Sequence, residues 1–244
     1  MQRLRRAFEG AEDRSAGFDA PLVDAAEVER LCPDVIVSWS YPHILPASTL
    51  ACARAGALNV HMALLPRHRG VDPLFWTYWD DDSNAGVTIH WMNERIDAGD
   101  VVVQDALPLL RGLPSRELYI QLASRSTDLL AAALMMIASG EAPRRPQDES
   151  HATYESAADT ARARVPFAHW PSERVWHVLS GLGDLRSGLL GVAADSPLEH
   201  GRATCYRIVH HVQPGRIVPT AEGYELHCLD GIVAVDRRSR RQLR

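Results

Sequence analysis

Residues 57–70 read ALNVHMALLPRHRG, an apolar run that leads into a segment containing proline, arginine and glycine. The run predicts a short buried strand, and Pro66 and Gly70 predict irregular backbone after it. Asn59 and His61 are two positions apart, and side chains at i and i+2 of an extended segment point to the same face. This stretch therefore predicts a strand that brings an amide and an imidazole to one spot.

The preceding residues predict a second strand beside the first. In PDVIVSWSYPHILP (33–46), the β-branched run Val35–Val37 is typical of a buried parallel strand, and 38–46 predicts an irregular loop. A helical pattern follows and ends at Gly56. Strand, helix and strand in this order indicate a right-handed parallel crossover, in which sites gather at the carboxyl ends of the strands.

Residues 86–109, GVTIHWMNERIDAGDVVVQDALPL, alternate apolar and polar positions on either side of IDAGD. This pattern predicts two strands joined by a turn, with Asp97 at its tip. The apolar spacing of 72–84 predicts a helix. A long amphipathic helix is predicted over 115–139, with Ser115 as its N-cap and Gly140 as its stop.

Composition divides the chain into three parts. Proline and charged residues replace the apolar period at 141–155, which predicts a linker between a catalytic domain at 1–140 and a second domain at 156–244. A helix is predicted at 173–182, followed by short strands separated by glycine-containing turns. A small antiparallel β-barrel is the simplest fold that accommodates these strands.

Composition also excludes several classes of protein. The longest apolar run, 129–138, is too short to cross a bilayer. Four scattered cysteines favour reduced thiols in a cytoplasmic protein over disulfides or a zinc site. All 26 basic residues are arginine, which excludes Schiff-base chemistry on lysine, and the net charge of −5 argues against a general polyanion binder. The acidic run 80–82 resembles a solvated helix end, so we predict no metal.

Taken together, four motifs resemble the signature of the 10-formyltetrahydrofolate-dependent formyltransferases. They are Asn-x-His, then Leu-Leu-Pro-Arg with Arg-Gly, then Gly-Val-Thr-Ile, and then Ile-Asp-x-Gly-Asp. The resemblance implies an α/β fold, with a Rossmann-like formyltransferase domain and a small OB-like β-barrel after it. Only about thirty residues precede PDVIV, without the strand and glycine turn that usually open the family's sheet. Either the gene start is misplaced, or the parallel sheet is shortened at its N-terminus, and in the second case we expect an exposed strand edge.

The resemblance also assigns roles to individual residues, with 10-formyltetrahydrofolate as co-substrate. Asn59 supplies an N–H for the oxyanion of a tetrahedral intermediate, His61 supplies a group that titrates near neutrality, and Asp97 orients or charges that ring. The pterin-contacting loop looks like SWSYPHILP. The residues predicted to bind the cofactor are Ser38, Trp39, Ser40, Tyr41, Pro42, Ile44, Leu45 and Asp100, the last with a turn-stabilising role as the alternative. Those predicted to bind the acceptor are Leu65, Pro66, Arg67, Arg69 and Gly70, and the two arginines either hold an anionic group or cap the loop.

Three functions stay open at this point. The preferred one is formyl transfer to the amine of a small molecule, such as a nucleotide-linked amino sugar or a secondary metabolite. Methionyl-tRNA is less favoured, because arginines and carboxylates are nearly balanced from residue 141 onward and a tRNA-binding domain needs basic residues. A non-catalytic homologue that binds folate or a partner is the third. The family resemblance is also compatible with a homodimer.

Overall fold

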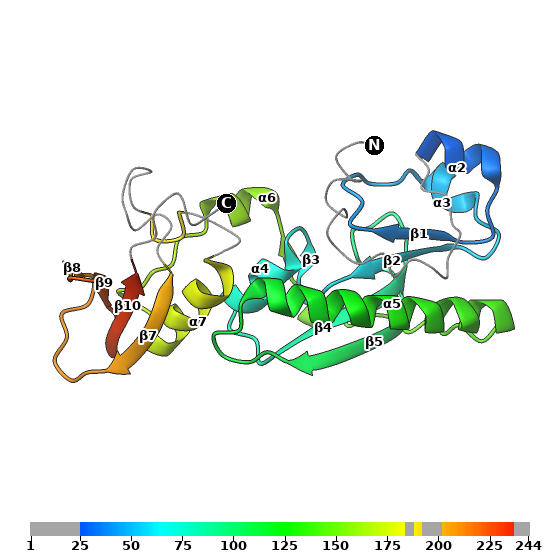
Figure 1. Ribbon diagram of the computed structural model, residues 1–244. Helices are drawn as coiled ribbons and strands as arrows, with labels where there is room; N and C mark the ends of the chain where they lie inside the picture. Colours follow the sequence, from blue (N-terminus) through cyan, green and yellow to red (C-terminus); the bar gives the residue numbers. More distant parts are fainter. Residues whose placement is uncertain (1–24, 184–187, 192–201, 237–244) are drawn as a thin grey trace.

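The computed structural model describes residues 25–183, 188–191 and 202–236 (Figure 1). The expectation about strands upstream of 33–46 falls partly on residues 1–24, which lie outside the described residues.

A four-stranded sheet forms the first half of the molecule. Its order is β1 (Ile36–Trp39), β2 (Ala57–His61), β4 (Asn84–Trp91) and β5 (Val101–Pro108). Strands β1 and β2 pair in parallel, as predicted, and among the described strands β1 lies at the edge of the sheet. The prediction of a parallel sheet is otherwise wrong, because β4 is antiparallel to β2 and the IDAGD turn then reverses the chain, so that β5 is antiparallel to β4. The sheet is therefore mixed, and the predicted hairpin is confirmed.

Helices cover this sheet unequally. The long α5 (Ser115–Ser139) runs along β4 and β5 (Figure 1), where Leu118 and Leu122 are fully buried. It ends where Gly140 adopts a left-handed conformation (φ 76°), as predicted. The N-cap prediction is wrong, because Pro114 occupies that position. The short helices α2 (Ala25–Leu31) and α3 (Ala47–Ala51) lie beside β1. In the described part of the chain, the apolar cluster at this edge of the sheet is small.

The predicted linker packs against the first half of the molecule. Val101 and Arg145 form an isolated antiparallel bridge, and a short helix, η1 (Glu149–His151), follows. Strand β6 (Tyr154–Glu155) then pairs in parallel with β3 (Arg69–Gly70), directly after the opening stretch of the sequence. Residues 141–155 thus connect the two halves and also support the loop that follows β2.

The second half contains helices and an antiparallel sheet. After α4 (Pro73–Trp79) in the first half, the helices α6 (Ala157–Arg162) and α7 (Ser172–Leu182) lead into four strands. The strands are β7 (Ala203–Ile208), β8 (Ile217–Pro219), β9 (Gly223–His227) and β10 (Gly231–Asp236), in the order β7-β10-β9-β8. This confirms a small antiparallel sheet, and its closure into an OB-like barrel stays a prediction.

One apolar core joins the two halves. Val87 of β4, Val178 of α7 and Val233 of β10 belong to the same cluster, and none of these side chains is exposed. Burial of this apolar surface is the main stabilising contribution to the fold. Among the described helices, none has the length and apolar character needed to span a bilayer.

Candidate active site

The polar pair predicted at the end of β2 meets the turn of the β4–β5 hairpin. Asn59 and His61 leave the same face of β2, and the Asp97 backbone is left-handed (φ 50°). The Asn59 amide nitrogen lies 3.1 Å from Asp97 Oδ1, and His61 Nδ1 lies 3.6 Å from Asp97 Oδ2. The structure therefore brings together the three side chains predicted to be catalytic.

Asp97 is held as an anion inside the protein. Its side chain is 12% exposed, and burial alone would raise its pKa. The adjacent His90 and His61 and the Gly70 N–H, which donates to Oδ2 at 2.8 Å, outweigh burial and lower the pKa of Asp97 to about 2. A permanent negative charge therefore lies beside His61 at neutral pH.

His90 borders this site, although the sequence pattern did not indicate it as a site residue. It lies directly across from Asn59 in the β2–β4 ladder. Its Nδ1 is 2.9 Å from the carbonyl oxygen of Trp91, which can only accept, so Nδ1 carries the proton. Its Nε2 lies 3.2 Å from the Asn59 amide nitrogen and 3.5 Å from Asp97 Oδ1, so His90 borders both of these side chains. The pairing register between β2 and the predicted hairpin places His90 opposite Asn59, and this register would have identified His90 from the sequence.

His61 is buried, and one of its nitrogens is committed to the backbone. Its side chain is 7% exposed, and Nε2 lies 2.7 Å from the carbonyl oxygen of His68. Burial lowers the pKa of His61, although the charge of Asp97 acts in the opposite direction. At neutral pH the ring is therefore uncharged and able to take up a proton.

The loop predicted to bind the acceptor is held mostly by the protein itself. The guanidinium of Arg69 is fully buried and donates to Gln147 (2.8 and 3.0 Å), Glu149 and Tyr154. This geometry favours the loop-capping alternative for Arg69 over binding of an anion. Arg67 is 40% exposed and donates to Asp82 at 2.8 Å, so it lies nearer to solvent.

The remaining residues of that loop have structural contacts. The N–H of Leu65 donates to Thr88 Oγ1 at 3.2 Å, and the peptide bond to Pro66 is cis. Gly70 has φ 100°, and a Cβ placed on it would lie 2.4 Å from the carbonyl oxygen of Glu155. Only glycine fits there without moving β6.

The predicted cofactor loop follows β1 at the same edge of the sheet. Ser38 pairs with Asn59 and Trp39 with Val60, so this loop leaves the sheet next to the polar cluster. Ser40 is left-handed (φ 53°), and the Tyr41 ring meets His43 edge to face. Of the other residues predicted to bind the cofactor, Pro42 and Ile44 are exposed and Leu45 packs on the small cluster beneath β1, whereas the Asp100 carbonyl accepts from the Trp91 N–H in the hairpin.

Gln147 is a further residue that the sequence pattern did not indicate, because it lies in the predicted linker. Its amide nitrogen donates to the backbone oxygens of Asp97 (2.8 Å) and Gly99 (2.7 Å), and its oxygen accepts from Arg69. This side chain therefore ties the hairpin turn to the loop after β2.

His68, Asp80 and Glu155 form the one group in the described part of the chain with the spacing of metal ligands, each offering an atom within 4.8 Å of the others. Both ring nitrogens of His68 already face carboxylate oxygens, those of Asp82 and Glu155. A carboxylate accepts a hydrogen bond, so both nitrogens carry protons and neither keeps a lone pair for a metal. The group is better described as an ion-paired histidine.

Comparison with known proteins places this geometry in a family. The sequence profile named Formyl transferase matches residues 12–134, half of the chain, and this range contains Asn59, His61 and Asp97. The chain belongs to the formyl transferase family. The resemblance drawn from four short motifs is thereby confirmed.

Individual formyl transferases extend the match. The methionyl-tRNA formyltransferase of Moorella thermoacetica is 32% identical over 209 residues, covering 81% of this chain and 66% of the relative. That of Synechococcus sp. is 39% identical over 129 residues, covering 53% and 40%. The chain thus spans between two fifths and two thirds of the length of these relatives.

A solved formyl transferase shares the fold. The N-formyltransferase from Helicobacter canadensis, in complex with folinic acid and dTDP-3-aminofucose, superposes with a TM-score of 0.67 at 14% identity. The superposition covers 98% of this chain and 95% of that one, so the likeness includes both halves of the molecule.

Proposed function

We propose that this chain transfers the formyl group of 10-formyltetrahydrofolate to the amino group of a small molecule. The observation that carries the proposal is the meeting of Asn59, His61 and Asp97 at the end of β2. The family membership supports the reaction class, and the folinic acid bound to the Helicobacter protein supports a folate as donor.

The reaction requires a proton acceptor and a donor to an oxyanion. The amine attacks the formyl carbon to give a tetrahedral intermediate, the bond from that carbon to N10 breaks, and a formamide and tetrahydrofolate result. The amine loses a proton to the neutral ring of His61, and the resulting imidazolium lies beside the anionic Asp97 and can return a proton to N10. His61 thus serves first as base and then as acid.

Asn59 is the donor to the oxyanion in this proposal. Its two amide hydrogens face Asp97 and His90 in the free protein, so a developing oxyanion must share or replace one of these bonds. The contact to His90 is slightly longer, 3.2 Å against 3.1 Å, and lacks the carboxylate charge that strengthens the bond to Asp97, so it is the weaker of the two. Loss of such an oxyanion donor typically slows catalysis by about 100- to 1,000-fold.

For the folate, we propose the end of β1, from Ser38, and the loop that continues to Leu45. The loop leaves β1 beside Asn59 and exposes Pro42 and Ile44, so it offers backbone and apolar groups next to the reacting centre. Asp100, whose carbonyl oxygen accepts from the Trp91 N–H at the base of the hairpin, is kept in the proposal as a further folate contact.

The choice of a small acceptor rests on charge. From residue 141 onward the arginines and carboxylates are in near balance, whereas a domain that grips tRNA phosphates needs a basic face. Methionyl-tRNA is the second candidate, because the relatives from Moorella and Synechococcus are methionyl-tRNA formyltransferases at 32% and 39% identity.

Titration of the purified chain with 10-formyltetrahydrofolate, followed by calorimetry and tryptophan fluorescence, is the first test. We expect saturable binding that survives in His61→Ala, whereas formyl transfer to a nucleotide-linked amino sugar disappears in that variant. Transfer to methionyl-tRNA alone would replace the proposed acceptor. Binding without transfer to either acceptor would favour a folate-binding homologue, and a folded chain that binds no folate would overturn the proposal.

A further inference from the structure

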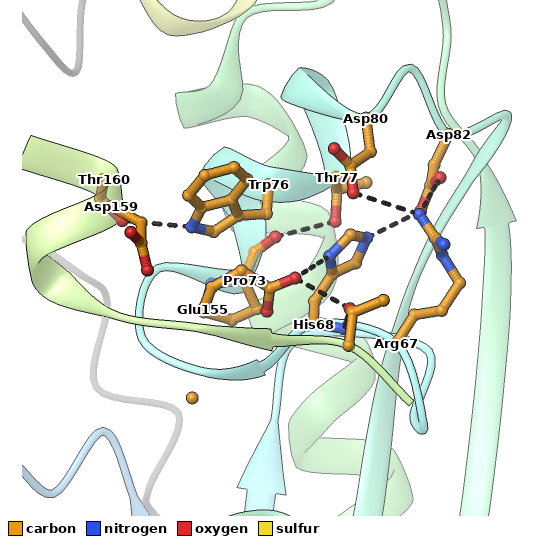
Figure 2. A network of polar contacts seen from close by, with 12 residues as sticks. Arg67, His68, Pro73, Trp76, Thr77, Asp80, Asp82, Glu155, Asp159 and Thr160 are labelled. Atoms are coloured by element: carbon orange, nitrogen blue, oxygen red, sulfur yellow. Dashed lines mark hydrogen bonds and ion pairs between the residues drawn. The ribbon is translucent and has the colours of Figure 1, made fainter. Parts of the chain in front are cut away.

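The loop after β2 contains a buried, doubly paired histidine that the mechanism above does not use. The side chain of His68 is 2% exposed. Its Nε2 lies 2.9 Å from Asp82 Oδ2, which follows α4, and its Nδ1 lies 3.2 Å from Glu155 Oε1 of β6. Figure 2 shows the ring between these two carboxylates. The imidazole therefore links the loop after β2 both to Asp82 and to β6.

The charges around His68 favour its cationic form. Burial disfavours that form, but the two carboxylates outweigh burial and raise the pKa of His68 to about 9. Arg67 pairs with Asp82 at 2.8 Å and with Asp80 at 3.4 Å, and the Thr153 hydroxyl donates to Glu155 at 2.8 Å. At neutral pH the ring thus holds both protons.

The backbone of the same residue is fixed in a conformation that is uncommon outside glycine. His68 has φ 60°, and its N–H donates to Thr153 Oγ1 at 2.8 Å. Its carbonyl oxygen is consequently aimed at His61 Nε2, 2.7 Å away. His68 therefore supplies both the side chain that is held by two carboxylates and the backbone carbonyl that faces His61.

That carbonyl determines the tautomer of His61. A carbonyl oxygen accepts and never donates, so His61 Nε2 must carry a proton. A neutral imidazole has only one N–H, so its Nδ1 keeps the lone pair. Nδ1 is the nitrogen that lies 3.6 Å from Asp97 Oδ2, in the polar cluster.

We infer that His68 is a positioning residue, whose clamped side chain holds its carbonyl on His61 Nε2 and thereby presents His61 Nδ1 as the proton acceptor. The catalytic role of this tautomer rests on the proposed function. The tautomer itself is a property of the free protein.

The primary test is NMR of the full chain labelled with ¹⁵N-histidine, with His61 assigned by comparison with His61→Ala. We expect long-range ¹H–¹⁵N correlations to show His61 in the neutral Nε2–H form at neutral pH. In His68→Asn we expect a mixture of the two tautomers, because asparagine tolerates the left-handed backbone but cannot bridge Asp82 and Glu155. His151→Asn, at an exposed histidine, is the matched control and should leave the tautomer unchanged.

Thr153→Val is a second variant with a milder change. It removes the hydroxyl that accepts from the His68 N–H and preserves the shape of the side chain. We expect a smaller shift toward the mixed tautomer, and it serves if His68→Asn does not fold. An Nδ1–H form in the unmodified protein, or the pure Nε2–H form in every folded variant, would overturn the inference.

Kinetics separate positioning from general stability. With an active acceptor, His68→Asn should lower kcat by about 10- to 100-fold, the usual range for groups that orient a functional side chain, while KM for the folate changes little. The pH at which kcat falls on the acid side should also move. If the chain transfers no formyl group but the tautomer behaves as expected, the proposed function fails and the positioning of His61 stands.

Discussion

The two sides of the candidate site differ in how they are built. On one side, Asp97 and the loop at residues 65–70 are largely buried. Hydrogen bonds of His68, Gln147 and Arg69 hold them in place. On the other, residues 40–45 extend from the edge strand β1 over a cluster of four buried residues, and Ile44 is 72% exposed. The side assigned to proton transfer is thus rigidly supported, and the side assigned to the folate is open to a ligand.

The largest effect should come from the centre of the supported side. Asp97→Asn removes the charge that would stabilise the His61 imidazolium, and we expect formyl transfer to fall by about 1,000-fold or more. Single-turnover assays at saturating folate measure this loss. Glu94→Gln, on the exposed part of the same hairpin, is the control and should stay near the unmodified rate.

A smaller effect concerns the stability of the same side as pH changes. The pKa of His68 is raised from 6.5 to about 9 in the folded chain, so its stabilising contribution is complete below 6.5 and is lost as pH rises through 9. That difference corresponds to at most about 3 kcal/mol of unfolding free energy. Urea unfolding across this range should show the loss.

The control for this prediction is the variant without the imidazole. His68→Asn should show a flatter dependence of unfolding free energy on pH between 6.5 and 9. An equal loss in the variant would mean that another group causes it.

Next in size is a steric test of the β3–β6 pairing. Gly70→Ala places a methyl group 2.4 Å from the Glu155 carbonyl and at φ 100°, and we expect a loss of about 2 kcal/mol or more. Gly140→Ala also has a positive φ, but nothing lies within 4 Å of the added Cβ, so a loss of about 1 kcal/mol is expected. Chemical denaturation compares the two, and equal losses would show that strain alone matters.

The smallest effect on stability should come from the open side. Ile44→Ser should change the unfolding free energy by less than about 0.5 kcal/mol, because the side chain is 72% exposed. If the loop covers the folate, the dissociation constant should rise about fivefold through lost apolar contact. Met135→Ser, equally exposed on α5, should alter neither quantity. Unchanged folate binding in Ile44→Ser would remove this residue from the folate site.

Local patterns in the sequence predicted the elements well. The period of α5, the β1–α3–β2 crossover and the IDAGD hairpin each depend on neighbours within a few residues, and all three are present. The same patterns located Asn59, His61 and Asp97, because strand alternation and one turn suffice to bring them together.

The residues that sequence reasoning missed act over longer separations. Gln147 reaches Asp97 across 50 positions, and His68 reaches Glu155 across 87. Proline and charge in 141–155 indicated a linker, since composition does not reveal pairing with a distant strand. For Arg69, the sequence left anion binding and loop capping open, because its partners Gln147 and Glu149 come from that same distant segment.

The pairing of β3 with β6 has a consequence for the order of assembly during synthesis. Arg69 and Tyr154 are 85 residues apart, so this contact closes a large loop of chain and forms late relative to the hairpins within it. A nascent chain that has emerged only as far as α5 already contains Asn59, His61 and Asp97, but it lacks the residues that fix the backbone around them. We therefore expect the backbone around these side chains to become fixed only after residues 147–155 have left the ribosome.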